Sequence, residues 1–405
     1  MTSARTRSRA GSVLLIGAAA LSLCAIVTVS VGPTTARAAR QRTIVKEGHI
    51  EPGAPDWVYV PFEVPRGVSR MHVEYDYNRT GNALDIGIFD EDGTGLGNEA
   101  GFRGWSGGFR TEFAISRSGA TPGYVPGAIR PGTWNVILGP YTVAPGGIDY
   151  RITITLSFDD PGHDFEPDPA DTSVSDAPGW YRGDLHIHTV HSDGRNTPDD
   201  VISGARAAGL DFFVSTEHNT DTAHAVWGEH VPPDLLAVNG EEVTTRGGHY
   251  NAIGLGAGNW IDWRYRPEDD QIRRFIDEIH ADSAVAVVNH PFAACKACDW
   301  SFPYEGMDGI EVWNGPWEPT DEAAVAKWDS LLREGRFLPA VGASDSHHPN
   351  TENVIGTPQT VVRAAGLDQD DIVAGLERGT SYVARGQGTA LAMTARSGSR
   401  SAGIG

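Results

Sequence analysis

Apolar and polar residues alternate with a period of two through the first part of the chain. The alternation is clearest in five runs, over residues 57–62, 71–75, 83–89, 133–138 and 150–156. This pattern is typical of strands with one buried face. Turns rich in Gly and Pro separate the runs, and no helical period is sustained. The pattern predicts an all-β sandwich or jelly-roll domain over residues 43–158, followed by a linker over residues 159–179.

The pattern changes after the linker. A helix is expected after Thr197-Pro198, which provide an N-cap and a first-turn proline, and it should end at Gly209. Further helices are expected over residues 267–282, 323–333 and 367–378, between apolar strands at 212–215, 285–288, 309–313, 338–342 and 381–384. Alternating helices and apolar strands predict an α/β domain over residues 180–390, with a buried parallel sheet, a pattern consistent with a closed barrel. Residues 397–403 are small and polar, which predicts a disordered tail over residues 391–405.

Histidines and carboxylates follow the apolar runs of this second domain. His186 and His188 alternate with Leu185 and Ile187, so both imidazoles leave one face of a strand. Imidazole is the commonest protein ligand for divalent metals. In barrels of alternating strands and helices, ligands cluster at the carboxyl ends of the strands. Similar fragments recur at Thr216-Glu217-His218, Gly240-Glu241-Glu242 with His249, Asn289-His290-Pro291 and Ser344-Asp345-Ser346-His347. We therefore expect a hydrolase built around several metal ions.

The charge of the chain excludes one class of substrate. The formal net charge is −21, and no basic stripe offsets it. Such a chain is repelled by nucleic acid backbones, so no long nucleic acid is expected as a partner. A small-molecule substrate, including a small phosphoester, remains compatible with this charge.

The first 38 residues resemble a secretory signal peptide. Arg5, Arg7 and Arg9 precede an apolar run over residues 13–31, and Ala36-Arg37-Ala38 supplies a cleavage site. A Sec-type signal predicts a secreted or extracytoplasmic protein with no stable membrane insertion after cleavage. The alternative is a retained membrane anchor, since the run approaches spanning length.

Two further features leave alternatives open. Cys295 and Cys298 favour a short-loop disulfide in an exported protein, over a redox pair or a zinc knuckle. The β-rich half has the character of an accessory module. Its aromatic residues Trp105, Trp134 and Tyr141 either pack in the core or line a carbohydrate groove, which would make a surface polymer its partner.

The motifs resemble those of a known family. Asp184-Leu185-His186-Ile187-His188-Thr189 with Ser192-Asp193-Gly194, followed by the four fragments named above, is similar to the PHP (polymerase and histidinol phosphatase) superfamily. The fragments Gly248-His249-Tyr250-Asn251 and Glu311-Val312-Trp313-Asn314 resemble most the carbaryl-hydrolase (CehA/McbA) family. The resemblance covers residues 180–390. It implies a distorted (β/α)7 barrel that holds two or three divalent ions, of Zn, Mn or Fe.

The resemblance also implies a role for each motif residue. One metal site would contain His186, His188, Glu242 and Asp345; Glu242 would bridge to a second with His249 and His290; and Asp193, His218 and His347 would form a third. Glu242, Asp345 and His347 would be the catalytic residues. Asp184 would orient His186 or His188, and Glu217 would be an outer partner in place of the family's usual Asp. This set implies hydrolysis by a metal-bound hydroxide.

The substrate remains open between two chemistries. The superfamily implies a small phosphoester, for which Arg195 and Arg246 are candidate substrate-binding residues. The subfamily implies a carboxylic ester, carbamate or amide, for which an apolar pocket is expected. Trp313 is a candidate for that pocket, with Trp227, Trp260, Trp263, Trp300 and Trp317 in the surrounding loops. A third hypothesis is a non-catalytic binding module that keeps metal for stability.

Overall fold

The computed structural model describes residues 40–349 and 351–403. The predicted signal peptide over residues 1–38 therefore lies outside the described residues. None of the helices in the described part is long and apolar enough to cross a membrane. Residues Ala39–Gly405 form one compact unit, so the division of this part at residues 159–179 stays a prediction.

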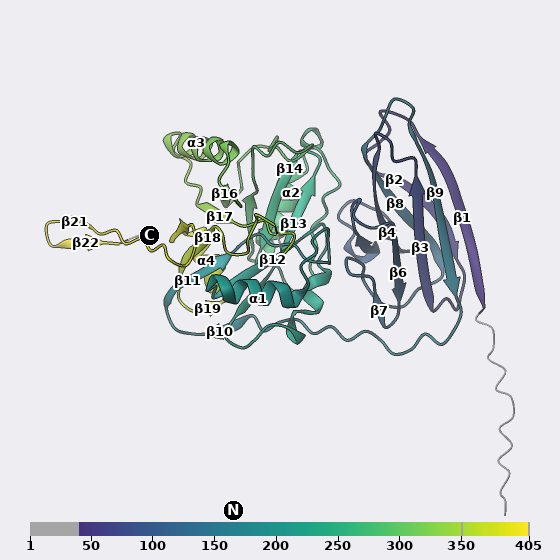
Figure 1. Cartoon of the computed structure of the whole chain (residues 1–405), viewed down its shortest axis with the longest axis horizontal. Coiled ribbons are helices and arrows are strands. Elements are labelled where there is room, and N and C mark those ends of the chain that lie inside the picture. Colours follow the sequence, from purple (N-terminus) through teal and green to yellow (C-terminus); the bar gives the residue numbers. More distant parts are fainter. Residues whose placement is uncertain (1–39, 350, 404–405) are drawn as a thin grey trace, which may run out of the picture. The chain divides into compact units, whose positions relative to one another are not determined.

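The β-rich half contains two antiparallel sheets (Figure 1). Residues of alternating character bury one face of each strand, as in β3, where Met71 and Val73 are fully buried and Glu74 is exposed. The facing side chains form one apolar core that includes Trp134 and Ile154. The first sheet has the order β1 (Gln41–Ile50), β9 (Ile148–Ser157), β3 (Arg70–Tyr77), β6 (Glu112–Ser116) and β7 (Gly119–Ala120); the second has the order β2 (Val58–Val64), β8 (Gly132–Thr142), β4 (Ala83–Phe89) and β5 (Phe102–Trp105).

A nine-stranded sheet forms the second half. It is nearly closed, because its end strands β17 and β20 contact one another. Among the described strands of this sheet, β14 and β18 run antiparallel to the other seven. The order is β17 (Ala340–Ala343), β16 (Gly309–Asn314), β15 (Val285–Val288), β14 (Gly248–Ile253), β13 (Leu236–Thr245), β12 (Phe212–His218), β11 (Gly179–Asp184), β18 (Gln359–Ala364) and β20 (Ser381–Ala384).

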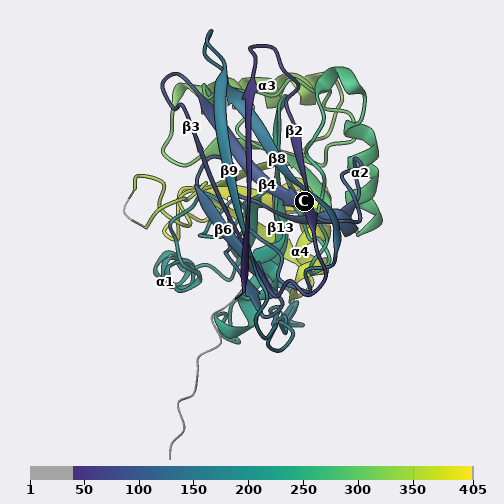
Figure 2. The same cartoon turned by 90° about the vertical axis from the view of Figure 1, so that its right-hand side faces the viewer.

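Four α-helices pack against this sheet in the described residues (Figure 2). The predicted caps of the first helix are present: the Thr197 hydroxyl accepts from the backbone N–H of Asp200, and Gly209 ends the helix at φ +63°. Glycine is favoured at a C-cap with this left-handed conformation because it has no Cβ to clash with the backbone. The helices are α1 (Pro198–Ala208), α2 (Ile272–Ala281), α3 (Pro319–Arg333) and α4 (Gln369–Glu377); single 3-10 turns cover Glu99–Gly101, Thr222–Ala225, Trp227–Glu229 and Pro267–Asp269.

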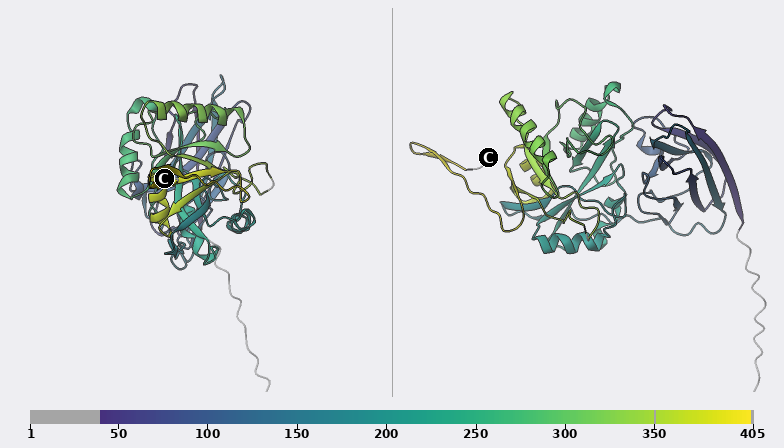
Figure 3. Two further views of the ribbon diagram at one scale, coloured as in Figure 1. Left: turned by 90° about the vertical axis from the view of Figure 1, so that its left-hand side faces the viewer. Right: turned by 45° about the horizontal axis from the view of Figure 1, so that its top comes forward.

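The sheet differs from the expected parallel arrangement. It is mixed, because the chain reverses at Arg246-Gly247 and pairs β13 with β14 as an antiparallel hairpin. The sevenfold strand–helix repeat stays a prediction. The short strands β10 (Ser173–Ser175) and β19 (Leu367–Asp368) pair with each other. In the segment where a disordered tail is expected, the structure has an exposed hairpin of β21 (Ala395–Ser397) and β22 (Arg400–Ala402), which stands clear of the sheet in Figure 3.

Aromatic side chains join the two halves of the described chain. Phe102 of β5 stacks on Trp260 with ring centroids 4.2 Å apart, and Trp105 packs on Trp263 at 4.7 Å. All four side chains are buried in one apolar cluster. The buried Arg264 guanidinium also donates to the Tyr59 hydroxyl at 2.6 Å. The two halves therefore share a continuous apolar core.

Candidate metal centre and its cavity

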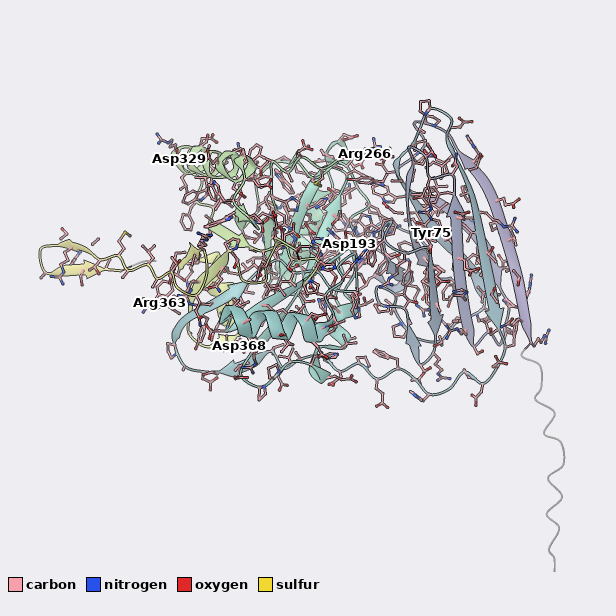
Figure 4. All side chains as sticks on the ribbon, viewed as in Figure 1. Tyr75, Asp193, Arg266, Asp329, Arg363 and Asp368 are labelled. Carbon is pink, nitrogen blue, oxygen red and sulfur yellow. A yellow bond between two sulfur atoms is a disulfide. The ribbon has the colours of Figure 1, made fainter. Side chains whose placement is uncertain are left out.

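The nine predicted ligands converge at one edge of the nine-stranded sheet. Strands that run in the same direction end at this edge, and the antiparallel β14 begins there. His218 is the last residue of β12, His249 is the second residue of β14, and Asp345 follows β17. Figure 4 labels Asp193 beside these strands. The topology thus brings together side chains that are up to about 160 residues apart in the sequence.

The first predicted group is the most buried part of this cluster. His186 Nε2 and His188 Nε2 both lie 3.3 Å from Glu242 Oε2. The same two nitrogens lie 3.4 Å and 3.1 Å from Asp345 Oδ1. All four of these atoms are buried without a hydrogen-bond partner in the structure. Unpartnered buried polar atoms are costly, and four that point at one another fit a shared divalent ion.

The second predicted group shares Glu242 through its other oxygen. His249 Nδ1 lies 3.2 Å and His290 Nε2 lies 3.1 Å from Glu242 Oε1. His218 Nδ1 lies 2.9 Å from Glu242 Oε2, and His218, Glu242 and His249 offer ligand atoms within 4.8 Å of one another. A carboxylate with imidazoles around both oxygens is arranged as a bridge between two ions.

The third predicted group lies next to the first. His347 Nε2 is 3.2 Å and His218 Nε2 is 3.6 Å from Asp193 Oδ1, a buried atom without a hydrogen-bond partner. His188 also offers an atom within 4.8 Å of all of these ligand atoms. The structure therefore brings all nine predicted ligands together, with His188 and His218 each near more than one group.

The cluster balances its own charges. Burial alone would raise the pKa of Glu242, but the neighbouring imidazoles of His218 and His186 hold it well below its usual range. Burial would lower the pKa of His186, but Asp345, Glu242 and Glu311 raise it well above its usual value. Buried carboxylates held ionised beside imidazoles favour cations, and a divalent ion can replace the protons of the imidazoles.

The predicted outer partners Asp184 and Glu217 contact the segments that carry the ligands. Asp184 accepts hydrogen bonds from the backbone N–H groups of His186, Ser344 and Gly356, at 3.3, 3.0 and 2.7 Å. It therefore fixes the backbone that carries His186 and Asp345. Glu217 accepts from the backbone N–H of Thr189 at 3.0 Å and from the Ser192 hydroxyl, and so holds the loop after His188.

Glu311 is an outer partner whose role was not predicted from the sequence. One of its oxygens lies 3.3 Å from His186 Nδ1, and the other accepts from the backbone N–H of His290 at 2.8 Å and from Asn314 Nδ2 at 3.0 Å. Asn289 likewise donates to Glu242 Oε1 at 2.9 Å. Glu311 could have been identified from the sequence, because it is an acidic residue near the carboxyl end of a buried apolar strand, where the ligands themselves lie.

A cavity of about 670 Å³ opens beside the cluster. Arg246 lines it, and its guanidinium lies over the Tyr141 ring at 4.9 Å and 3.8 Å from Asp85 Oδ2. Arg195 is exposed and does not line the cavity, and neither does Trp313, whose indole N–H donates to the Gly315 carbonyl.

The tryptophans expected around the mouth are placed mostly elsewhere. Trp227 and Trp260 are buried in apolar clusters. Of the six, Trp263 lines the cavity, beside Trp105 from the β-rich half. Cys295 and Cys298 form the expected disulfide, with Cα atoms 5.4 Å apart, in a loop that also lines the cavity.

Comparisons with known proteins give only weak similarities. No protein-family model matches the chain, and no curated protein matches its sequence. Among solved structures, the chain is similar to a two-domain protein from Bacteroides vulgatus that contains a predicted PHP-like metal-dependent phosphoesterase. The identity is 23%, the TM-score is 0.39, and the match covers 54% of this chain and 67% of the other. It is also similar to an amidohydrolase from Chromobacterium violaceum solved with sulfate and no metal, at 19% identity and a TM-score of 0.34, covering 50% and 97%. Similarities of this size decide neither the fold nor the reaction of this chain.

Proposed function

We propose that this protein is an exported metal-dependent hydrolase of small phosphoesters that belongs to the PHP superfamily. The observation that carries the proposal is the set of buried, unpartnered ligand atoms on His186, His188, Asp193, Glu242 and Asp345. Their mixed imidazole and carboxylate chemistry suits Zn, Mn or Fe. Bound divalent ions would lower the pKa of a water molecule and polarise the phosphoryl oxygen.

In this proposal, different residues of the chain would have different roles. Glu242 would hold two ions at a fixed separation, because imidazoles surround both of its oxygens. Asp345, between His186 and His188, would complete the most buried position. Arg246 lines the same cavity and offers N–H donors to an anionic substrate. The walls of the cavity would exclude bulk water and so strengthen these interactions.

A direct test uses the chain from residue 40 onward. Bound metals are counted per chain, and the same sample is assayed on 4-nitrophenyl phosphate, bis(4-nitrophenyl) phosphate and a 1-naphthyl carbamate. We expect two or three ions and phosphoester turnover. His188→Ala and Asp345→Ala should abolish turnover while the β-rich half stays folded, and Asp277→Asn, an exposed control, should not. Full activity in His188→Ala and Asp345→Ala would contradict the assignment.

Hydrolysis of a carbamate, carboxylic ester or amide is the second candidate. It is favoured by the aromatic side chains Trp105, Trp263 and Phe109 in the cavity lining, and it would agree with the proposed closeness to the carbaryl-hydrolase family. Turnover of the carbamate alone would support this candidate. Metal binding without turnover of any ester would instead support the non-catalytic module.

Export is the remaining part of the proposal. It is supported by the signal-like residues 1–38 of the sequence. N-terminal sequencing of the mature protein from culture medium should begin near residue 39, and recovery of the intact N-terminus in a membrane fraction would support an anchor instead.

A further inference from the structure

The β-rich half contributes one wall of the candidate active-site cavity. Trp105 ends β5, and the loop that follows it, residues 106–109, lines the cavity together with Asp85 of β4 and Tyr141 of β8. His218, His249 and His290 of the metal cluster line the same cavity. A substrate held at the cluster would therefore touch both halves of the chain.

This wall is fixed in place. The Trp105–Trp263 and Phe102–Trp260 contacts join β5 to the second half. The loop itself is tied to β4, since Ser106 N–H donates to the Ile86 carbonyl at 3.1 Å, and the Ser106 hydroxyl lies 2.9 Å from the Tyr124 hydroxyl. A wall that is already ordered loses little conformational entropy when a ligand binds.

The disulfide loop contacts this wall and lines the same cavity. Tyr141 donates from its hydroxyl to the Lys296 carbonyl, and the Lys296 ammonium donates to the Tyr141 carbonyl. Lys296 lies between Cys295 and Cys298, so the disulfide restrains this contact. The β-rich half and the disulfide loop thus meet at Tyr141, beside Arg246.

The wall contains aromatic side chains as well as the polar side chains of Asp85 and Ser106. Phe109 is 40% exposed and lines the cavity, although removing an aromatic side chain from water is favourable and lowers the free energy. Trp105 and Trp263 add two further aromatic side chains to the lining. Flat aromatic groups pack favourably on such surfaces, in stacked or edge-on arrangements.

We propose that this wall is a subsite for the leaving group of the substrate and that it selects phosphoesters of aromatic alcohols, with Phe109 as a specificity-determining residue. The inference rests on the proposed function for the reaction, but the subsite itself follows from the cavity lining. It gives the β-rich half a part in substrate recognition.

The kinetic test compares two substrates on the chain from residue 40 onward. The kcat/KM value for 4-methylumbelliferyl phosphate is divided by that for ethyl phosphate, which lacks a ring. Phe109→Ala should lower this ratio by about three- to tenfold, since one aromatic contact is lost. Phe337→Ala is the matched control, because Phe337 is 69% exposed and does not line the cavity. Equal ratios in the two variants would overturn the inference.

A binding test is independent of turnover. Binding of 4-methylumbelliferone, the free alcohol, is followed by its fluorescence. Wild type should bind it, and Gly108→Leu should weaken binding, because a side chain at Gly108 would begin 3.4 Å from Asp85 in the cavity wall. Gly119→Leu, at a position with open space, should not. No binding to wild type, or equal binding by both variants, would overturn the subsite. Selective binding without phosphoester turnover would support the subsite and contradict the proposed reaction.

Discussion

At the scale of single residues, the candidate centre depends on carboxylates that hold imidazoles in place. Glu242 lies between imidazoles on both of its oxygens, and Glu311 reaches His186 from behind. An outer carboxylate fixes the orientation of the ring and raises the basicity of the nitrogen that faces the ion. The affinity for metal ions should therefore depend on residues that need not touch the ions.

Glu311→Gln should weaken metal binding. The amide keeps the shape of the side chain but removes the negative charge beside His186 Nδ1, which lies 3.3 Å away. Loss of such a partner typically lowers metal affinity by about 10- to 100-fold. Equilibrium dialysis against Zn and Mn would measure the change. Glu322→Gln, an exposed residue of α3, is the control, and equal affinities in the two variants would show that Glu311 has no such role.

His224 predicts a pH dependence of stability. Burial lowers its pKa to about 4, and its Nε2 lies 2.9 Å from the Gly240 carbonyl oxygen. In the unfolded chain the pKa of a histidine is about 6.5. The unfolded chain therefore binds a proton that the folded chain does not. The stabilisation is complete above about pH 6.5 and is lost as the pH falls toward 4, by up to about 1.4 kcal/mol per pH unit.

The measurement is urea unfolding at pH 7.5, 6.0 and 5.0. The free energy of unfolding should fall less steeply with decreasing pH in His224→Gln than in wild type, and His163→Gln, at an exposed position, should follow wild type. Parallel curves for wild type and His224→Gln would contradict the prediction.

At the scale of elements, strand ends and helix caps position the cluster. Most ligands follow or end a strand of the nine-stranded sheet, whereas Glu242 lies within β13 and His249 lies near the start of the antiparallel β14. The strand directions bring all of them to one edge. The loop that carries Asp193 continues directly into the N-cap of α1 at Thr197. The stability of this cap and the position of Asp193 are therefore linked, because Thr197 lies four positions after Asp193 in the chain.

Thr197→Ala should destabilise the protein. It removes the hydroxyl that accepts from the Asp200 backbone N–H at 3.2 Å. Loss of an N-cap side chain costs about 1 kcal/mol of unfolding free energy. Urea unfolding would detect this change. Ser118→Ala, at an exposed turn between β6 and β7, should change the free energy of unfolding little. An equal loss in both variants would show that the Thr197 cap does not stabilise the protein.

At the scale of the whole molecule, the shared aromatic core decides how the described chain unfolds. Phe89, Phe102 and Trp105 from the β-rich half belong to the same apolar cluster as Trp260 and Trp263. Two halves that share a core of this kind should unfold together. The cavity wall discussed above would then persist as long as the metal centre does.

Calorimetry of the chain from residue 40 onward should therefore show a single transition, with equal calorimetric and van't Hoff enthalpies. Phe102→Ala, which removes a ring stacked on Trp260, should cost about 3–5 kcal/mol and separate the transition into two. Trp180→Ala, at an exposed site, should keep one transition. Two transitions in wild type would contradict cooperative unfolding.

Much of the architecture was determined by local patterns in the sequence. Alternation with a period of two predicted the antiparallel sheets, and Thr197-Pro198 with Gly209 predicted the ends of α1, because side-chain spacing and capping act over a few residues. The ligand motifs predicted the cluster for the same reason: each follows an apolar strand, and parallel strands end at one edge. The disulfide was favoured by two nearby cysteines.

Other features were decided only by the tertiary structure. The antiparallel β14 and β18, the placement of Glu311 behind His186, the exposure of Arg195 and the burial of Trp260 all depend on which strands and loops become neighbours. Trp105 gave an ambiguous signal, since a strand aromatic can pack in a core or line a groove, and here it does both at the junction of the two halves. The sequence by itself determined which chemistry gathers at the sheet edge, whereas contacts across more than a hundred residues decided what surrounds it.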